Sequence, residues 1–150
     1  MPSLKPASLW LRIAAAVYDL FPLIALWMLS AGLFLLVARG RVDVAHPPFA
    51  YQIALRATLL CVSTAYFVVS WSRGGQTIGM RAWHLRVVAS DGGALPWPRA
   101  LLRFAVAVVS LAAFGAGFFW CLIDRQQRCW HDIAASSALM RKFVSAGQGD

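Results

Sequence analysis

The sequence is poor in acidic residues: it contains no glutamate, and all six of its acids are aspartate. Fourteen lysines and arginines oppose them, so the formal net charge is +8. Such a positive excess indicates nucleic acid or anionic lipid as a partner. The absence of a basic groove interleaved with aromatics, and of any nucleic-acid-binding motif, argues against nucleic acid. The arginines lie at the edges of apolar runs instead, which favours lipid headgroups.

Other signals are also missing. The three cysteines, Cys61, Cys121 and Cys129, form no CxxC pair, so no disulfide framework is expected. The stretch "MPSLKPASLWLR" is polar and aromatic, and the apolar run after it is too long for the core of a signal peptide. No internal repeat and no low-complexity tract is visible. We therefore expect a single domain without a cleavable leader.

Apolar residues are abundant. They make up 60% of the chain, and the mean hydropathy is +0.64, against an apolar content of roughly 45–50% in soluble domains. Three apolar segments, at about 13–37, 54–71 and 104–123, approach or exceed the ~20 residues that cross a bilayer as a helix. Tryptophans flank these segments, as interfacial aromatics do. The sequence therefore predicts an all-α membrane protein, a bundle of three hydrophobic membrane segments.

The linker 72–103 is expected to be ordered on the membrane surface. Its first part can form a short amphipathic helix, "HLRVV" at 84–88 is typical of a short strand, and Asp91–Gly92 of a tight turn. Pro98 is tolerated in the first turn of the next helix. Residues 124–150 are expected to form a polar C-terminal tail. The whole chain, 1–150, is then one membrane domain with an interfacial turn or hairpin between segments two and three.

The third segment allows two topologies. If it crosses the membrane and the N-terminus is cytoplasmic, seven lysines and arginines fall on each side, a tie that the positive-inside rule disfavours. If it re-enters and returns, the count becomes eleven against three, and the small residues of "AAFGAG" at 112–117 offer a place to bend. An uninterrupted apolar run is most simply one span, because re-entrant backbone must be shielded by protein. A full span is therefore the primary expectation.

Asp19 is the most informative polar residue. It lies nine residues after Trp10, or ~13 Å along a helix, which is close to mid-membrane. A charged aspartate there costs about 2.5–3.5 kcal/mol, so a partner, a proton or a cavity must offset the cost. Ser63 and Thr64 on the second segment are expected at similar depth, and Arg103 is long enough to approach from the rim.

His131 and Asp132 follow the third segment in "RQQRCWHDIAASSAL". Zinc requires four closely spaced ligands, and catalysis requires a nucleophile with an oriented base; neither pattern is present. We therefore predict no metal, no cofactor and no enzymatic activity. Asp132 is expected to cap a short helix beginning at Ile133 and to pair with an arginine.

The glycine-containing stretch "GGQTIGMR" has the spacing of a phosphate loop between Gly74 and Gly79. Met80 and Arg81 stand where the lysine and the serine or threonine would bind nucleotide, so that interpretation fails. Glycine backbone beside arginines can still bind a lipid phosphate. The candidate headgroup residues are Arg73, Arg81 and Arg86.

Three motifs in order carry a family resemblance: "RIAAAVYD" at 12–19, "GGQTIGMRAWHLRVV" at 74–88 and "HDIAASSAL" at 131–139. Together they resemble the RDD family of small bacterial membrane proteins over about residues 8–141. The resemblance implies that the arginine and two aspartates of the family name are Arg12, Asp19 and Asp132. Met80 replaces the family's usual lysine, His84 a glycine, and Ala135–Ser136–Ser137 the usual Ala-Gly-Thr.

The resemblance implies a multi-pass protein of the bacterial inner membrane, and transport, including sodium–proton exchange, has been proposed for the family. Two functions are expected to compete. One is transport of a cation, proton or small solute through Asp19, with Arg12, Asp132, Ser63, Thr64, Arg103 and His131 in a polar cluster and several copies enclosing the pathway. The other is a membrane adaptor or assembly factor that binds anionic lipid or a partner membrane protein. The N-terminus is expected on the cytoplasmic side.

Overall fold

Two long helices dominate the computed structural model, which describes residues 4–39, 42–43 and 45–142. Helix α1 covers Leu9–Ala38 and contains Pro22, and α2 covers Phe49–Val69 and continues as one π-helical turn, Ser70–Gly74. Both are long and apolar enough to cross a membrane, and only 6% of the most apolar window of each is buried inside the protein. Their outer faces are therefore available to lipid, which confirms the first two predicted segments.

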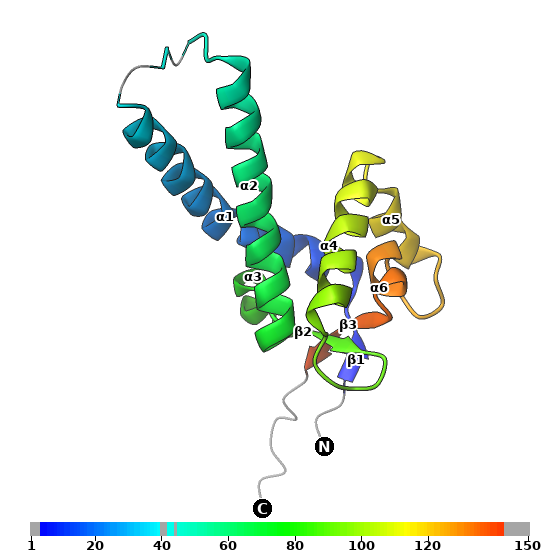
Figure 1. Cartoon of the computed structure of the whole chain (residues 1–150). Coiled ribbons are helices and arrows are strands. Elements are labelled where there is room, and N and C mark those ends of the chain that lie inside the picture. Colours follow the sequence, from blue (N-terminus) through cyan, green and yellow to red (C-terminus); the bar gives the residue numbers. More distant parts are fainter. Residues whose placement is uncertain (1–3, 40–41, 44, 143–150) are drawn as a thin grey trace, which may run out of the picture.

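The third predicted segment is bent. It consists of α4 (Trp97–Ala112), the single turn α5 (Ala116–Phe119) and a 3-10 turn (Trp120–Leu122), and its two halves meet at 108°. Figure 1 shows α4 rising beside α2 and α5 turning back beside it. The break falls within "AAFGAG", where Phe114 and Gly115 have positive φ. The apolar run expected to form one span is therefore divided into two helices, and the division lies at the small residues that offered a place to bend.

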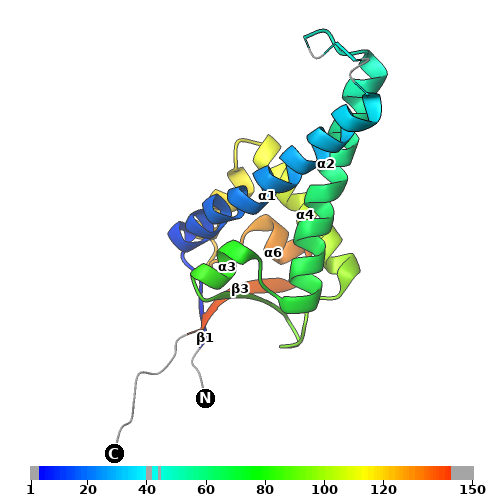
Figure 2. The same ribbon diagram turned by 90° about the vertical axis from the view of Figure 1, so that its left-hand side faces the viewer.

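A three-stranded antiparallel sheet joins distant parts of the chain. Strand β3 (Ser137–Lys142) is central and pairs with β1 (Leu4–Pro6) on one edge and β2 (Leu85–Ala89) on the other. The pairing brings the two ends of the described chain together at the end of the molecule opposite the α1–α2 loop (Figures 1 and 2). The strand predicted at 84–88 is confirmed, whereas β1 and β3 were not predicted.

The hydrophobic core lies between this sheet and the neighbouring ends of the helices. The inward residues of β2, Leu85, Val87 and Ala89, are buried together with Leu139 of β3 and Trp71 in the π-helical turn after α2. The short helix α3 (Ile78–Ala82), the amphipathic helix expected in the linker, packs on α1 (Figure 2). This small core makes the sheet end a folded layer from which the apolar helices project.

The segment predicted as a polar tail is folded as far as residue 142. It forms α6 (Trp130–Ala134) and β3, and Cys129, Ala135 and Leu139 are buried. A short helix was expected in this segment, but β3 was not, because alternating strand residues surrounded by polar ones carry a weak hydrophobic signal. The rest of that predicted tail, 143–150, lies outside the described residues.

Two helix ends use a left-handed residue before a strand. His84 follows α3 with φ 53°, and Ser136 follows α6 with φ 46°. Glycine is the usual residue at this position because it has no Cβ to clash. These are the two positions at which the family resemblance implies glycine, and the left-handed backbone gives the physical reason for that preference.

Replacing Ser136 by glycine should therefore stabilise the protein. Left-handed backbone destabilises a residue that has a side chain by ~1–2 kcal/mol. Glycine avoids this cost, but its greater entropy in the unfolded chain offsets about 0.5–1 kcal/mol of the gain. We expect the free energy of unfolding in detergent to rise by about 0.5–1 kcal/mol. Ser90→Gly, at an exposed position without positive φ, is the matched control and should lower it.

Candidate functional site

A buried ion-pair cluster lies where the start of α1, the second turn of α4 and the first turn of α6 meet. Asp132 Oδ2 is 2.6 Å from Arg12 Nη1, and Asp132 Oδ1 is 2.5 Å from Arg103 Nη1. All three side chains are at least 95% buried. One carboxylate therefore holds two guanidinium groups, and we call Arg12, Arg103 and Asp132 the clasp.

Local structure orients each member of the clasp. Asp132 is the third residue of α6 and also accepts from the backbone N–H of Cys129 at 3.1 Å, which closes a capping box. The predicted position of the cap is therefore wrong: α6 begins at Trp130 and not at Ile133, Cys129 is its N-cap residue, and Asp132 contributes from inside the first turn. Arg12 donates further to the carbonyls of Ala7 and Gln127.

Arg103 is held from two other directions. It donates to Ser137 Oγ at 2.7 Å, and its guanidinium lies 5.1 Å from the ring centre of Trp71. A cation over an aromatic face is stabilised by the ring quadrupole. Through these contacts the clasp connects α1, α2, α4, α6 and β3, so its position depends on the whole fold.

The clasp keeps Asp132 ionised. Burial alone would raise the pKa of this carboxyl, but the positive charges of Arg103 and Arg12 hold it well below its usual range. Burial and the same two arginines lower the pKa of His131 to about 3, against the opposing effect of Asp132. Burial raises the pKa of the Cys129 thiol to about 12. Asp132 thus carries a fixed charge beside a neutral histidine and a neutral thiol.

Cys129, His131 and Asp132 have ligand atoms within 4.8 Å of one another, a spacing compatible with a metal ion. Both oxygens of Asp132 already face guanidinium groups, and Cys129 Sγ is 3.5 Å from Arg12 Nη1. A metal cation would have to displace an arginine from its counter-ion. The surroundings of these three residues therefore disfavour a metal.

Asp19 forms a second, separate site. It is 2% exposed, and Oδ1 accepts from Tyr66 Oη at 2.7 Å and from the backbone N–H of Gly79 at 2.8 Å. Oδ2 accepts from Thr77 Oγ1 at 2.5 Å. Within the described residues Asp19 forms no salt bridge. Its charge is thus met by three neutral donors alone.

Close packing of α3 on α1 makes this arrangement possible. A Cβ at Gly79 would overlap the carbonyl oxygen of Ala15 and lie 3.0 Å from the carboxyl carbon of Asp19. Only glycine lets the backbone approach so closely. Thr77 caps α3 by accepting from the N–H of Met80. The linker therefore encloses Asp19, and protein covers the carboxylate.

The structure unites some of the predicted residues and separates others. Arg12, Arg103, Asp132 and His131 lie together, and the charge of Asp19 is not part of that cluster. The hydroxyls expected beside Asp19 have other partners: Ser63 accepts from Trp27 Nε1, and Thr64 donates to the carbonyl of Leu60. Counting depth along straight, parallel helices produced this error, because α1 and α2 diverge toward the sheet end (Figure 2).

Tyr66 and Thr77 were missed as partners of Asp19. Thr77 and Gly79 belong to the stretch "GGQTIGMR". The sequence suggested phosphate binding for this stretch, whereas the structure shows that it packs against Asp19. The arginines assigned to headgroups, Arg73, Arg81 and Arg86, are all exposed. Arg81 lies near Gly74 and Arg86 near Gly75.

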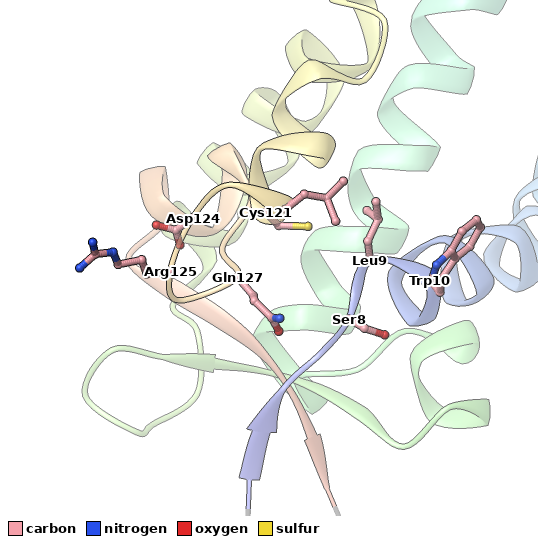
Figure 3. Close-up of a pocket in the computed structure, with 8 residues that line it drawn as sticks. Ser8, Leu9, Trp10, Cys121, Asp124, Arg125 and Gln127 are labelled. Atoms are coloured by element: carbon pink, nitrogen blue, oxygen red, sulfur yellow. The ribbon is translucent and has the colours of Figure 1, made fainter.

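A surface cavity of about 270 Å³ opens beside the start of α1. Its lining residues are Ser8, Leu9, Trp10, Cys121, Leu122, Asp124, Arg125 and Gln127. Figure 3 shows Leu9 and Trp10 on the α1 side, Cys121 and Asp124 on the other, and Arg125 pointing away. None of the Asp19 partners lines this cavity.

Of three comparisons with known proteins, one found a match. No curated protein and no solved structure matches the chain. The sequence model of the RDD family matches residues 6–136, which include Arg12, Asp19 and Asp132. This membrane protein, with its Arg12–Asp132 pair and its buried Asp19, belongs to the RDD family.

Proposed function

We propose that this membrane protein is a carrier in which Asp19 exchanges a proton for a monovalent cation. The observation that carries the proposal is the contrast between the two buried aspartates. Asp132 is neutralised by two arginines, so its charge is fixed. Asp19 has only neutral donors, so its charge is open to a mobile cation or proton.

The surroundings of Asp19 suit this chemistry. Tyr66 and Thr77 present hydroxyl groups, which donate to the carboxylate and can rotate to offer oxygen lone pairs to a cation. The carbonyl of Ala15 lies beside Gly79, and hard cations prefer carboxylate, carbonyl and hydroxyl oxygen. A proton or a cation can therefore neutralise Asp19 in turn.

The clasp has a supporting role in this proposal. It fixes the start of α1, and with it the helix that carries Asp19, to the sheet end of the protein. We place that end on the cytoplasmic side of a bacterial inner membrane, because eleven basic residues then face the cytoplasm against three outside. Several copies would enclose the pathway, since the described part of one chain supplies two long unbroken helices and one bent segment.

Asp19→Asn should abolish exchange. We expect the proton flux that a sodium or potassium gradient drives in proteoliposomes to fall at least tenfold, because an amide keeps the shape but loses the charge and the titratable proton. Asp43→Asn, in the exposed α1–α2 loop, is the control and should keep wild-type flux. Wild-type flux in Asp19→Asn, or none above empty vesicles in the unmodified protein, would refute the carrier.

The exposed arginines favour a second candidate function, an adaptor that binds anionic lipid or a partner membrane protein. Arg73, Arg81 and Arg86 form no salt bridge in the described part of the chain. Added phosphatidylglycerol should then raise the unfolding temperature of the wild type and not that of the triple Arg→Gln variant. Asp19→Asn should respond like the wild type, which separates the two functions.

A further inference from the structure

The bent third segment is closed at its base. The strand before it, β2, and the strand after it, β3, pair from Leu85↔Arg141 to Ala89↔Ser137. Arg103 in α4 and Asp132 after the return form an ion pair at 2.5 Å. The chain therefore leaves the sheet layer in α4 and comes back to that same layer.

The backbone at the bend has internal hydrogen bonds. The N–H of Ala113 donates to Val109, that of Gly115 to Ser110 at 2.8 Å, and that of Phe118 to Gly115. Ala116 and Phe119 N–H groups also have partners within the bend. Backbone can lie in hydrocarbon only when its polar groups are satisfied without water. Five N–H groups of this turn meet that condition.

The side chains of the bend are apolar and exposed. Phe114 at the tip is 98% exposed, Leu111 before it 70% and Ile123 after the return 75%. No charged residue occurs between Phe104 and Ile123. A tip of this kind in water would be a large exposed apolar patch, which soluble surfaces avoid.

The length of the segment matches one leaflet. Nine residues separate Arg103, in the clasp, from Ala112 at the end of α4, about 13 Å at 1.5 Å per residue. Half of a ~30 Å hydrocarbon core is about 15 Å. The return from Ala116 ends at Asp124, where polar residues resume.

We infer that α4 and α5 form a re-entrant hairpin that enters one leaflet from the sheet side and returns to that side, with lipid acyl chains covering its tip. The chain then crosses the membrane twice, through α1 and α2. The sheet and the clasp lie on one side, and the α1–α2 loop lies on the other. This arrangement does not depend on whether Asp19 carries a cation.

Single cysteines test the topology. In a chain with Cys61→Ala, Cys121→Ala and Cys129→Ser, we would introduce Ala45→Cys, Ser90→Cys or Gln126→Cys at exposed positions and add a membrane-impermeant maleimide to sealed vesicles. Positions 90 and 126 should react from one side and position 45 from the other. Labelling of 126 from the side of 45 would overturn the inference. If the background unfolds, the native chain serves, with its own labelling as the blank.

A spin label tests what covers the tip. At Phe114→Cys in phospholipid vesicles, collisions with oxygen should exceed those with a water-soluble nickel chelate, as at Leu33→Cys on the lipid-exposed face of α1, and the reverse should hold at Ser90→Cys. An aqueous signature at 114 would contradict insertion. Spin–spin broadening at 114 would show a second copy at the tip in place of lipid, and would also overturn the proposed covering.

Discussion

Replacing Asp132 by asparagine is expected to destabilise the protein by about 3–5 kcal/mol, the cost of leaving a buried charge without its partner. The substitution preserves shape but removes the only charge that faces both Arg12 and Arg103 in the described structure. Two guanidinium groups would then lie together in a buried site. We expect a smaller folded fraction in detergent, which thermal or denaturant unfolding can measure.

Two further variants make this result specific to the clasp. Asp124→Asn breaks a partly exposed pair with Arg128, and such pairs contribute no more than about 1 kcal/mol. Adding Arg103→Met to Asp132→Asn removes one of the uncompensated charges, so the double variant should be more stable than Asp132→Asn alone. If Asp132→Asn behaved like Asp124→Asn, the clasp would not hold the fold together.

Acidification from pH 7 to pH 5 should cost the protein about 2 kcal/mol through His131. The pKa of His131 in the folded protein is lowered to about 3, whereas an unfolded histidine titrates near pH ~6.5. Below that pH His131 binds a proton in the unfolded chain but stays neutral in the folded protein. Stability is therefore lost as the pH falls from about 6.5 toward 3, at up to ~1.4 kcal/mol per pH unit.

The histidine can be separated from the other titrating groups. Because the pKa of Asp132 is lowered in the folded protein, its contribution to stability is complete above the unfolded pKa of ~3.9 and is lost only below it. The contribution of Asp132 to stability therefore changes little between pH 7 and pH 5. His131→Gln should therefore flatten the stability profile in this range. His46→Gln, at an exposed side chain, should retain the wild-type acid sensitivity. An equally steep profile in His131→Gln would contradict the assignment.

The two buried aspartates, Asp19 and Asp132, differ in how far the sequence could describe them. Because an ionised group in an apolar helix requires compensation, Asp19 was recognisable as a buried carboxylate that needs partners. The identity of those partners was not, since Thr77 and Gly79 reach it only through the packing of α3 on α1. For Asp132 the sequence indicated a helix cap and an arginine partner, but not which arginines.

Hydropathy and motif order alone determined that lipid is the solvent of this chain, that α1 and α2 span it, and that the chain resembles the RDD family, whose sequence model matches residues 6–136. Those properties are local, because they depend on the composition of each segment. Tertiary structure decided that the third segment bends back and that Arg12 meets Asp132, a contact across 120 residues. The physical reason is that a run of apolar residues indicates only a preference for hydrocarbon. The path of the chain after the bend depends on β-pairing and ion pairs with distant parts of the sequence.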